Sequence, residues 1–172
     1  MEAIKAMTER RSVRGFKNEQ ITNEQLKAIL EAGKFAPTGR GRQSPVMIVI
    51  QNEKKIAELS KINAQIMGTP DTDPFYGAKT VIIVLANKAM PTYIYDGSLV
   101  MGNLMNAAYA VGVDSCWIHR AREEFEMPWG KALLAELGIE GEYEGIGHVA
   151  LGYRTAPLPE PKPRKEDYVY KL

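Results

Sequence analysis

The chain has 172 residues, which is enough for one domain with a core of its own, and no internal repeat divides it. Lys and Arg total 22 against 21 for Asp and Glu, which excludes the strong basic field typical of proteins that bind duplex nucleic acid. One cysteine, Cys116, excludes an internal disulfide, and two histidines, His119 and His148, are too few for a typical metal centre.

The opening MEAIKAMTERR lacks the apolar stretch of a signal peptide, and no window of the sequence is long and apolar enough to cross a bilayer. We therefore expect a cytoplasmic protein that binds neither membrane nor nucleic acid. With so few thiols and imidazoles, any redox chemistry has to come from an organic cofactor.

A basic segment, RRSVRGF, follows the short helical start. If it is extended, Arg10, Ser12 and Arg14 project to one side at intervals of about 6.7 Å, and the residues between them point the other way. The planar N–H donors of arginine, together with a serine hydroxyl, can hydrogen-bond to a phosphate or a carboxylate. The segment is therefore either a cradle for a phosphate-bearing ligand or a solvated basic turn, and charge alone does not decide between them.

Helical and strand patterns alternate along the rest of the chain. Thr22 and Gln25 have the spacing of a capping box at the start of one helix, and Asn52 is placed to cap another. The run TVIIVLA is apolar on both faces, which predicts a central strand with a layer on each side. The predicted helices are 23–35, 53–67, 96–111 and 128–137, and the predicted strands are 45–50, 80–86, 113–118 and 148–151.

The last residues, 154–172, differ in character from the rest. They contain four prolines and no helical period, while Tyr168 and Tyr170 share one face of an extended segment. We expect an extended arm that lies across another surface or adds to a sheet edge, with a disordered terminus as the alternative.

This order of elements predicts an α+β fold of three layers, α/β/α, with a central mixed sheet flanked by helices. No GxGxxG follows a strand, and GRGRQS lacks the terminal Gly-Lys-Ser/Thr of a P-loop, so neither a Rossmann fingerprint nor a P-loop is present. If the chain binds a phosphate, it does so with arginines.

Four segments, in order, together resemble the FMN-dependent nitroreductase family: RRSVRGF, APTGRGRQSP, GVDSCWI, and HVALGY with a later KPR. The resemblance covers nearly the whole chain and implies a single nitroreductase-like flavin-binding domain over residues 1–172, in a homodimer that exchanges the C-terminal arm. It implies FMN as cofactor and NADH or NADPH as electron donor. The implied activity is an NAD(P)H oxidoreductase that reduces nitroaromatic, quinone or similar electron-poor small molecules by ping-pong hydride transfer, with flavin N5 and no catalytic side chain carrying the chemistry.

The resemblance divides the basic segment between two tasks. The opening motif and the late Lys-x-Arg of the family converge on the FMN phosphate, whereas the residue matching Arg14 is a cation near the pyrimidine edge of the flavin. A positive charge there stabilises the reduced, anionic flavin. The residues implied at the phosphate are Arg10, Arg11, Ser12, Lys162 and Arg164.

Two other segments are implied to approach the flavin ring. The first, APTGRGRQSP, usually comes from the partner subunit, and it departs from the family at Gly41, where Asn is common. The second offers a backbone N–H to flavin N5 at about residues 118–120. The residues implied at the ring are Pro37, Thr38, Gly39, Gln43, Ile118, His119 and Arg120.

Four nearby side chains have simpler interpretations. His119 is a candidate general acid because an imidazole titrates near neutrality, but the implied N5 contact needs only its backbone. Cys116 in an apolar strand is interpreted as core, and His148 as structural. Trp117 packs either beside the cofactor or in the core.

Two other functions stay open. One is a specialised flavin enzyme of the same superfamily, such as a dehalogenase or a dehydrogenase. The other is a flavin-binding or partner-binding module without turnover. The physiological acceptor, the choice between NADH and NADPH and the reduction potential do not follow from the sequence.

Overall fold

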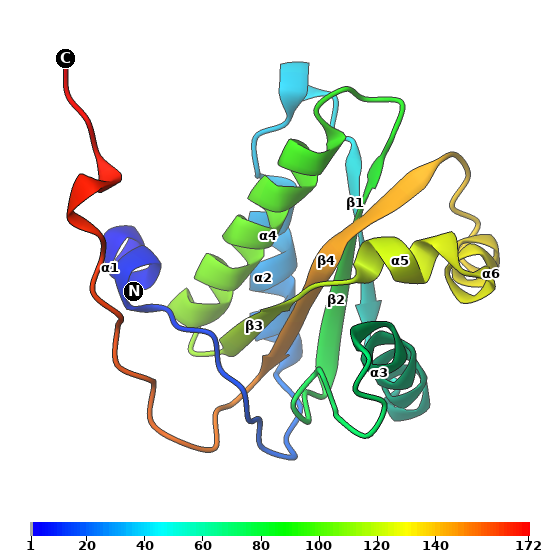
Figure 1. Ribbon diagram of the computed structural model, residues 1–172, viewed down its shortest axis with the longest axis horizontal. Helices are drawn as coiled ribbons and strands as arrows, with labels where there is room; N and C mark the ends of the chain where they lie inside the picture. Colours follow the sequence, from blue (N-terminus) through cyan, green and yellow to red (C-terminus); the bar gives the residue numbers. More distant parts are fainter. Residues whose placement is uncertain (1) are drawn as a thin grey trace.

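Four strands form the central sheet of the computed structural model, which describes residues 2–172 (Figure 1). Their order across the sheet is β1-β2-β4-β3, and every neighbouring pair is antiparallel. The strands are β1 (Pro45–Ile50), β2 (Thr80–Asn87), β3 (Asp114–Ile118) and β4 (Tyr143–Gly152).

The sheet is therefore antiparallel among its named strands, where we expected a mixed one. β2 and β3 run in the same direction, but β4 lies between them and pairs antiparallel with both. The only parallel pairing in the described residues is an isolated bridge between Ser12 and Ser115.

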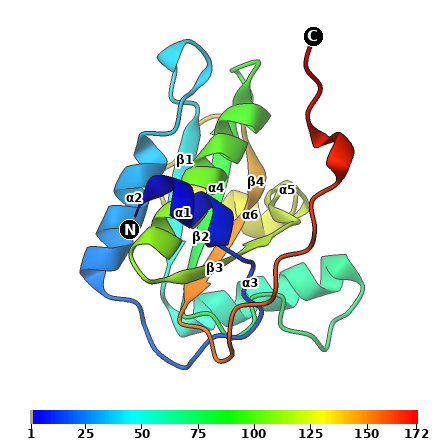
Figure 2. The ribbon, with the colours of Figure 1, turned by 90° about the vertical axis from the view of Figure 1, so that its left-hand side faces the viewer.

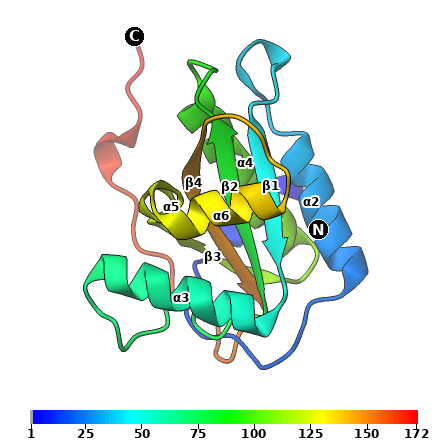
Figure 3. The same ribbon diagram turned by 90° about the vertical axis from the view of Figure 1, so that its right-hand side faces the viewer.

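Helices cover both faces of the sheet, which confirms the three layers (Figures 1 and 3). α2 and α4 lie on one face, and α3, α5 and α6 lie on the other. The helices are α1 (Ala3–Glu9), α2 (Asn23–Lys34), α3 (Glu53–Met67), α4 (Tyr93–Ala110), α5 (Ala121–Glu126) and α6 (Pro128–Glu136), with short 3-10 turns at Gly39–Gly41 and Glu166–Tyr168.

β2 is the buried centre that its sequence predicts. Its side chains alternate between the two apolar layers because successive residues of a strand point to opposite faces. Ile83 and Leu85 pack in the core under α3, α5 and α6, whereas Ile82 and Val84 pack against α2 and α4. Every one of these residues is fully buried.

The predicted helix starts are largely confirmed. The Thr22 hydroxyl accepts from the Gln25 N–H while the Gln25 side chain accepts from the Thr22 N–H, and Asn52 accepts from the N–H of Lys55. α4 begins at Tyr93, three residues before the expected Asp96. Asp96 thus lies in the first turn of the helix, where its side chain accepts hydrogen bonds from Gly39 and Ser44 of a distant loop.

Two features were not predicted. β4 begins at Tyr143, well before the expected 148, and it runs through Gly145 and Gly147. At Gly145 an added Cβ would clash with the carbonyl oxygen of Ala121, so the glycine lets α5 approach the strand. α5 itself has only 6 residues, too few to show a helical period in the sequence.

The C-terminal arm is extended, as expected, and lies on the same side of the molecule as α1 (Figures 1 and 2). Its base is anchored, since the Arg154 guanidinium bonds to the Asp114 carboxylate at 3.0 Å and the Thr155 N–H donates to the Gly15 carbonyl at 3.1 Å. Leu158 still packs against the core, but every residue from 159 onward is exposed.

None of the helices within residues 2–172 combines the length and the apolar character needed to span a bilayer.

Candidate functional site

The basic segment lies along the free edge of β3. Ser12 forms the parallel bridge to Ser115, and the Val13 N–H donates to the Ser115 carbonyl at 3.0 Å. Val13 is buried in the core and Arg14 is exposed. The segment therefore has the alternation that an extended chain predicts, with its apolar residue directed inward.

Two arginines of this segment carry buried donors that have no partner within residues 2–172: Arg10 Nη1 and Arg11 Nε. Arg11 Nη1, by contrast, donates to the carbonyls of Thr8 and Arg10 at 2.8 Å each and so closes the end of α1. Burial lowers the pKa of Arg10, Arg11 beside it lowers the pKa further and Cys116 partly opposes this, yet a guanidinium stays charged at neutral pH. Buried, charged donors without acceptors are a site for an anion.

A carboxylate on α4 organises the loop at 37–44. The Gly39 N–H donates to Asp96 Oδ1 at 2.9 Å, and the hydroxyls of Ser44 and Thr92 donate to Oδ2 at 2.7 and 3.1 Å. Burial acts to raise the pKa of Asp96, but these three hydrogen bonds outweigh it and hold the pKa below its ordinary value. Asp96 was not among the expected site residues.

The same loop has an irregular backbone, and several of its side chains are exposed. Arg40 and Gln43 both have positive φ, and the Gln43 N–H donates to the Thr38 hydroxyl at 3.0 Å. Pro37 and Gln43 are exposed, and the loop contributes to the walls of two hollows of about 130 and 280 Å³.

Residues 118–120 form a tight corner between β3 and α5. Arg120 has a left-handed backbone, with φ of 79°, and its side-chain Nε donates to Asn63 at 2.9 Å. The His119 side chain is exposed. Within residues 2–172 the backbone N–H groups of His119 and Arg120 have no acceptor, so both are available to a ligand.

Trp117 lies at the surface against α4, and it is not in the core. Its side chain is half exposed and, with Met101, Met105 and Ile146, lines a hollow of about 210 Å³. Its ring meets that of His119 edge to face at 5.9 Å. The hollow therefore adjoins the 118–120 corner.

Cys116 is a core residue, as expected. It is buried, and burial raises the pKa of its thiol despite the opposing effects of Arg14, Ser12 and Arg10. A thiol kept protonated is a poor nucleophile.

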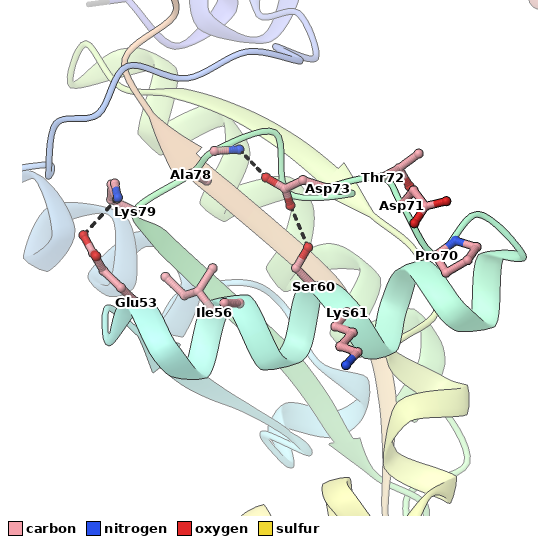
Figure 4. Close-up of a pocket in the computed structure, with 12 residues that line it drawn as sticks. Glu53, Ile56, Ser60, Lys61, Pro70, Asp71, Thr72, Asp73, Ala78 and Lys79 are labelled. Carbon is pink, nitrogen blue, oxygen red and sulfur yellow. Dashed lines mark hydrogen bonds and ion pairs between the residues drawn. The ribbon is translucent and has the colours of Figure 1, made fainter.

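A larger hollow lies elsewhere in the described residues. It measures about 470 Å³ and lies between α3 and the loop at 68–79 (Figure 4). There Asp73 accepts from the Ser60 hydroxyl, and Lys79 pairs with Glu53 at 2.9 Å. This hollow contains none of the expected site residues.

The profile of the nitroreductase family matches residues 7–153. The chain belongs to the nitroreductase family. The matched range ends at Tyr153, directly before the arm.

Individual members of the family resemble this chain over nearly all of its length. A relative from Archaeoglobus fulgidus, provisionally named an NADH dehydrogenase/NAD(P)H nitroreductase, is 28% identical over 97% of this chain and 90% of its own. A nitroreductase of Bacteroides fragilis solved with bound FMN is 28% identical, covers 100% of this chain and 99% of its own, and superposes with a TM-score of 0.90. An FMN-dependent nitroreductase of Clostridium difficile is 25% identical over 99% of this chain and 97% of its own, with a TM-score of 0.82.

Two of the family's expected segments lie together in this one chain. The bridge between Ser12 and Ser115 is parallel, so Arg14 follows Ser12 in the direction of Ile118, and its charge acts on Cys116. A hollow of about 250 Å³ opens between residues 12–15 and the base of the arm. At one end, the unpaired guanidinium donors of Arg10 and Arg11 suit the phosphate of FMN. At the other end, the unpaired backbone N–H groups of His119 and Arg120 suit the edge of its ring.

The other two segments are not brought to this place by the chain itself. The loop at 37–44 lies beside the first turn of α4, while the basic segment lies beyond its other end (Figure 1). Lys162 and Arg164 are exposed on the arm, and no hydrogen bond or ion pair joins either to the rest of residues 2–172.

Proposed function

We propose that this chain binds FMN along the edge of β3, between Arg10 and the corner at 118–120, and reduces electron-poor small molecules with electrons from NADH or NADPH. One observation carries the proposal: buried guanidinium donors without acceptors and open backbone N–H groups lie along one strand edge. The nitroreductase of Bacteroides fragilis with bound FMN, which matches the chain over its whole length, supports it.

Each end of the site has its own task in this proposal. Arg10 and Ser12 bind the phosphate with charge-assisted hydrogen bonds. Arg11 contributes its unpaired Nε, whereas its Nη1 is already bonded to carbonyl oxygens at the end of α1. Arg14 places a positive charge near the pyrimidine edge. FMN, when bound, supplies the two-electron hydride chemistry of the reaction.

At the ring end, the backbone of residues 118–120 donates to N5, and no side chain is required as a catalyst. The hollow beside Trp117 lies next to this corner and has an apolar lining, so a flat nitroaromatic or quinone is the class of acceptor that suits it.

We propose further that the site is completed in a homodimer. Large apolar side chains are exposed on α1, on α4 and on the arm, which is the pattern of a surface covered by a partner. The partner's loop at 37–44 then supplies the contacts of Pro37, Thr38, Gly39 and Gln43, and the arm supplies Lys162 and Arg164. The exposed large apolar residues of α1, α4 and the arm are Ile4, Met7, Ile94, Tyr95, Leu99, Tyr168, Val169, Tyr170 and Leu172, and the exposed Trp117 of β3 lies beside α4. A cytoplasmic location stays a prediction.

Purified protein tests the proposal directly. We expect it to be yellow with flavin absorbance, to release FMN on denaturation and to bleach with NADH or NADPH under anaerobic conditions. Added nitroaromatic or quinone should restore the absorbance. A protein that binds FMN but is not bleached would be a flavin-binding module, and a protein that stays colourless in excess FMN would contradict the proposal.

A further inference from the structure

Three polar side chains are completely buried beneath the corner at 118–120. They are Asn63 of α3, Glu124 of α5 and His148 of β4, each with no exposed surface. An amide, a carboxylate and an imidazole are costly to bury unless each polar atom has a partner. Replacing such a network with apolar residues of similar volume often leaves a protein equally stable. Stability alone therefore does not explain why these three residues are present, and their contacts indicate another role.

Every residue of the corner is held by the network. His148 Nδ1 lies 3.2 Å from the Ile118 carbonyl oxygen. Asn63 Nδ2 donates to the carbonyl oxygen of His119 at 3.0 Å. The guanidinium Nε of Arg120 donates to Asn63 Oδ1 at 2.9 Å. Three consecutive residues are thus attached to a buried anchor.

The network is complete in itself. The Ile118 carbonyl can only accept, so His148 Nδ1 carries a hydrogen. His148 Nε2 lies 2.6 Å from Glu124 Oε2, with one proton between them, and the pair is neutral overall whichever atom holds it. Glu124 Oε1 accepts from Asn63 Nδ2 at 2.5 Å. The anchor therefore adds no net charge to the site and acts through geometry.

The corner needs such an anchor because its backbone is unusual. Arg120 has φ of 79°, a left-handed conformation that a side chain of this size rarely adopts and that persists where surrounding contacts over-determine it. The open N–H groups belong to His119 and Arg120, the same residues that Asn63 holds.

We propose that Asn63, Glu124 and His148 are positioning residues, which hold residues 118–120 in the one conformation that presents their open backbone N–H groups to flavin N5. This inference rests on the proposed FMN site. The three residues contact neither cofactor nor substrate themselves. They act through the backbone of the corner.

Two substitutions to alanine on one helix give the main test. Asn63→Ala removes the central anchor, and Leu59→Ala, one turn earlier on α3, removes a fully buried apolar side chain that is no part of the network. We expect both to lower the melting temperature. Only Asn63→Ala should slow flavin reduction by the nicotinamide that reduces the native protein, by about 10- to 100-fold, because small misplacements of reacting groups have effects of this size.

Glu124→Gln is the conservative counterpart. A glutamine can donate to His148 Nε2 while its oxygen accepts from Asn63, so every hydrogen bond survives and the shared proton is lost. We expect reduction within about threefold of native. Glu124→Leu, which breaks the same bonds, should resemble Asn63→Ala.

A readout apart from turnover is the amide ¹H–¹⁵N spectrum of the apo-protein titrated with FMN. The signals of His119 and Arg120 should shift in the native protein, in Leu59→Ala and in Glu124→Gln, and the shift should be largely lost in Asn63→Ala. If Asn63→Ala does not fold, Arg120→Asn removes one anchor at a partly exposed position with a residue that tolerates a left-handed backbone, and should diminish the same shifts.

The outcomes separate this inference from the proposed function. If FMN binds and is reduced normally in Asn63→Ala or, where that variant is unfolded, in Arg120→Asn, with both amide shifts intact, the network is only structural and the positioning role is wrong. If the native protein binds no FMN, the proposed site itself is wrong.

Discussion

The two ends of the candidate cofactor site are built in opposite ways. At the corner of residues 118–120 the chain satisfies its own buried polar groups and leaves only backbone N–H groups open. At the basic segment, Arg10 and Arg11 keep buried donors without partners, and the cations of the arm lie apart from them. In the proposed site, one chain therefore preorganises the ring end, whereas the ligand and the arm would complete the phosphate end.

The difference between the two ends is tested most strongly by deleting residues 160–172, which leaves the anchored base of the arm in place. This deletion should have the largest effect on FMN binding. We expect the dimer to dissociate and FMN affinity to fall by about 10²- to 10⁴-fold, since Lys162 and Arg164 each contribute roughly 1.5–3 kcal/mol as charged hydrogen-bond donors. Light scattering and flavin fluorescence measure the two losses. The full-length double variant Lys162→Ala/Arg164→Ala should lose only affinity. A truncated protein that is still dimeric and yellow would contradict the comparison.

Next in size is Arg10→Ala, which removes a buried charged donor from the phosphate end. We expect FMN affinity to fall by about 10- to 100-fold, with the ring end unaffected. Arg11→Ala should weaken FMN binding less, because Nη1 of Arg11 is already bonded to α1. Fluorescence titration of both variants measures the two losses of FMN affinity. Equal losses would show that Arg10 and Arg11 contribute equally to FMN binding, in spite of the bonds between Arg11 and α1.

Asp96 tests whether the loop at 37–44 behaves like the preorganised end. Its pKa in the folded state lies below the ordinary 3.8, so ionised Asp96 contributes stability at pH above about 4, and this contribution is lost as pH falls through the folded pKa. Asp96→Asn should lower the melting temperature by roughly 2–6 °C at pH 7, and the gap should narrow below pH 4. Thermal unfolding from pH 7 to pH 3 measures it. A gap independent of pH would mean that hydrogen-bond geometry, without charge, holds the loop.

The smallest effect on binding is expected for Arg14→Ala. Arg14 is exposed and has no hydrogen bond in the described chain, so FMN affinity should change by less than about threefold. Loss of its positive charge should lower the reduction potential of bound FMN. Equilibrium dye titration measures the potential, and an unchanged potential with weakened binding would assign Arg14 to the phosphate instead.

Local patterns predicted most of the fold. The capping residues Thr22 and Asn52 and the two-faced strand β2 depend on neighbours in the sequence, and all three are confirmed. The antiparallel order could not be predicted in this way, because it depends on β4 entering between β2 and β3. That placement is decided by packing between distant segments.

The residues of the candidate site differ in the same way: those with a local sequence signal could be predicted, and those with distant partners could not. The basic segment and its alternation could be recognised because the charges are adjacent in the sequence. Asp96 and Asn63 were missed because their partners lie far away: Gly39 is 57 positions from Asp96, and Glu124 is 61 positions from Asn63. A lone Asn on an amphipathic helix gives no local signal of burial.

The anchored base of the arm has a consequence for how the last cations reach a phosphate. Arg154 is fixed to Asp114, and Lys162 follows it by eight positions, so even a fully extended chain cannot carry Lys162 more than about 29 Å from that anchor. A charge confined to such a sphere has an effective concentration on the order of 10 mM. The arm is thus a tether: in the proposed site, its ammonium group would reach a bound phosphate as a local event within the assembled dimer.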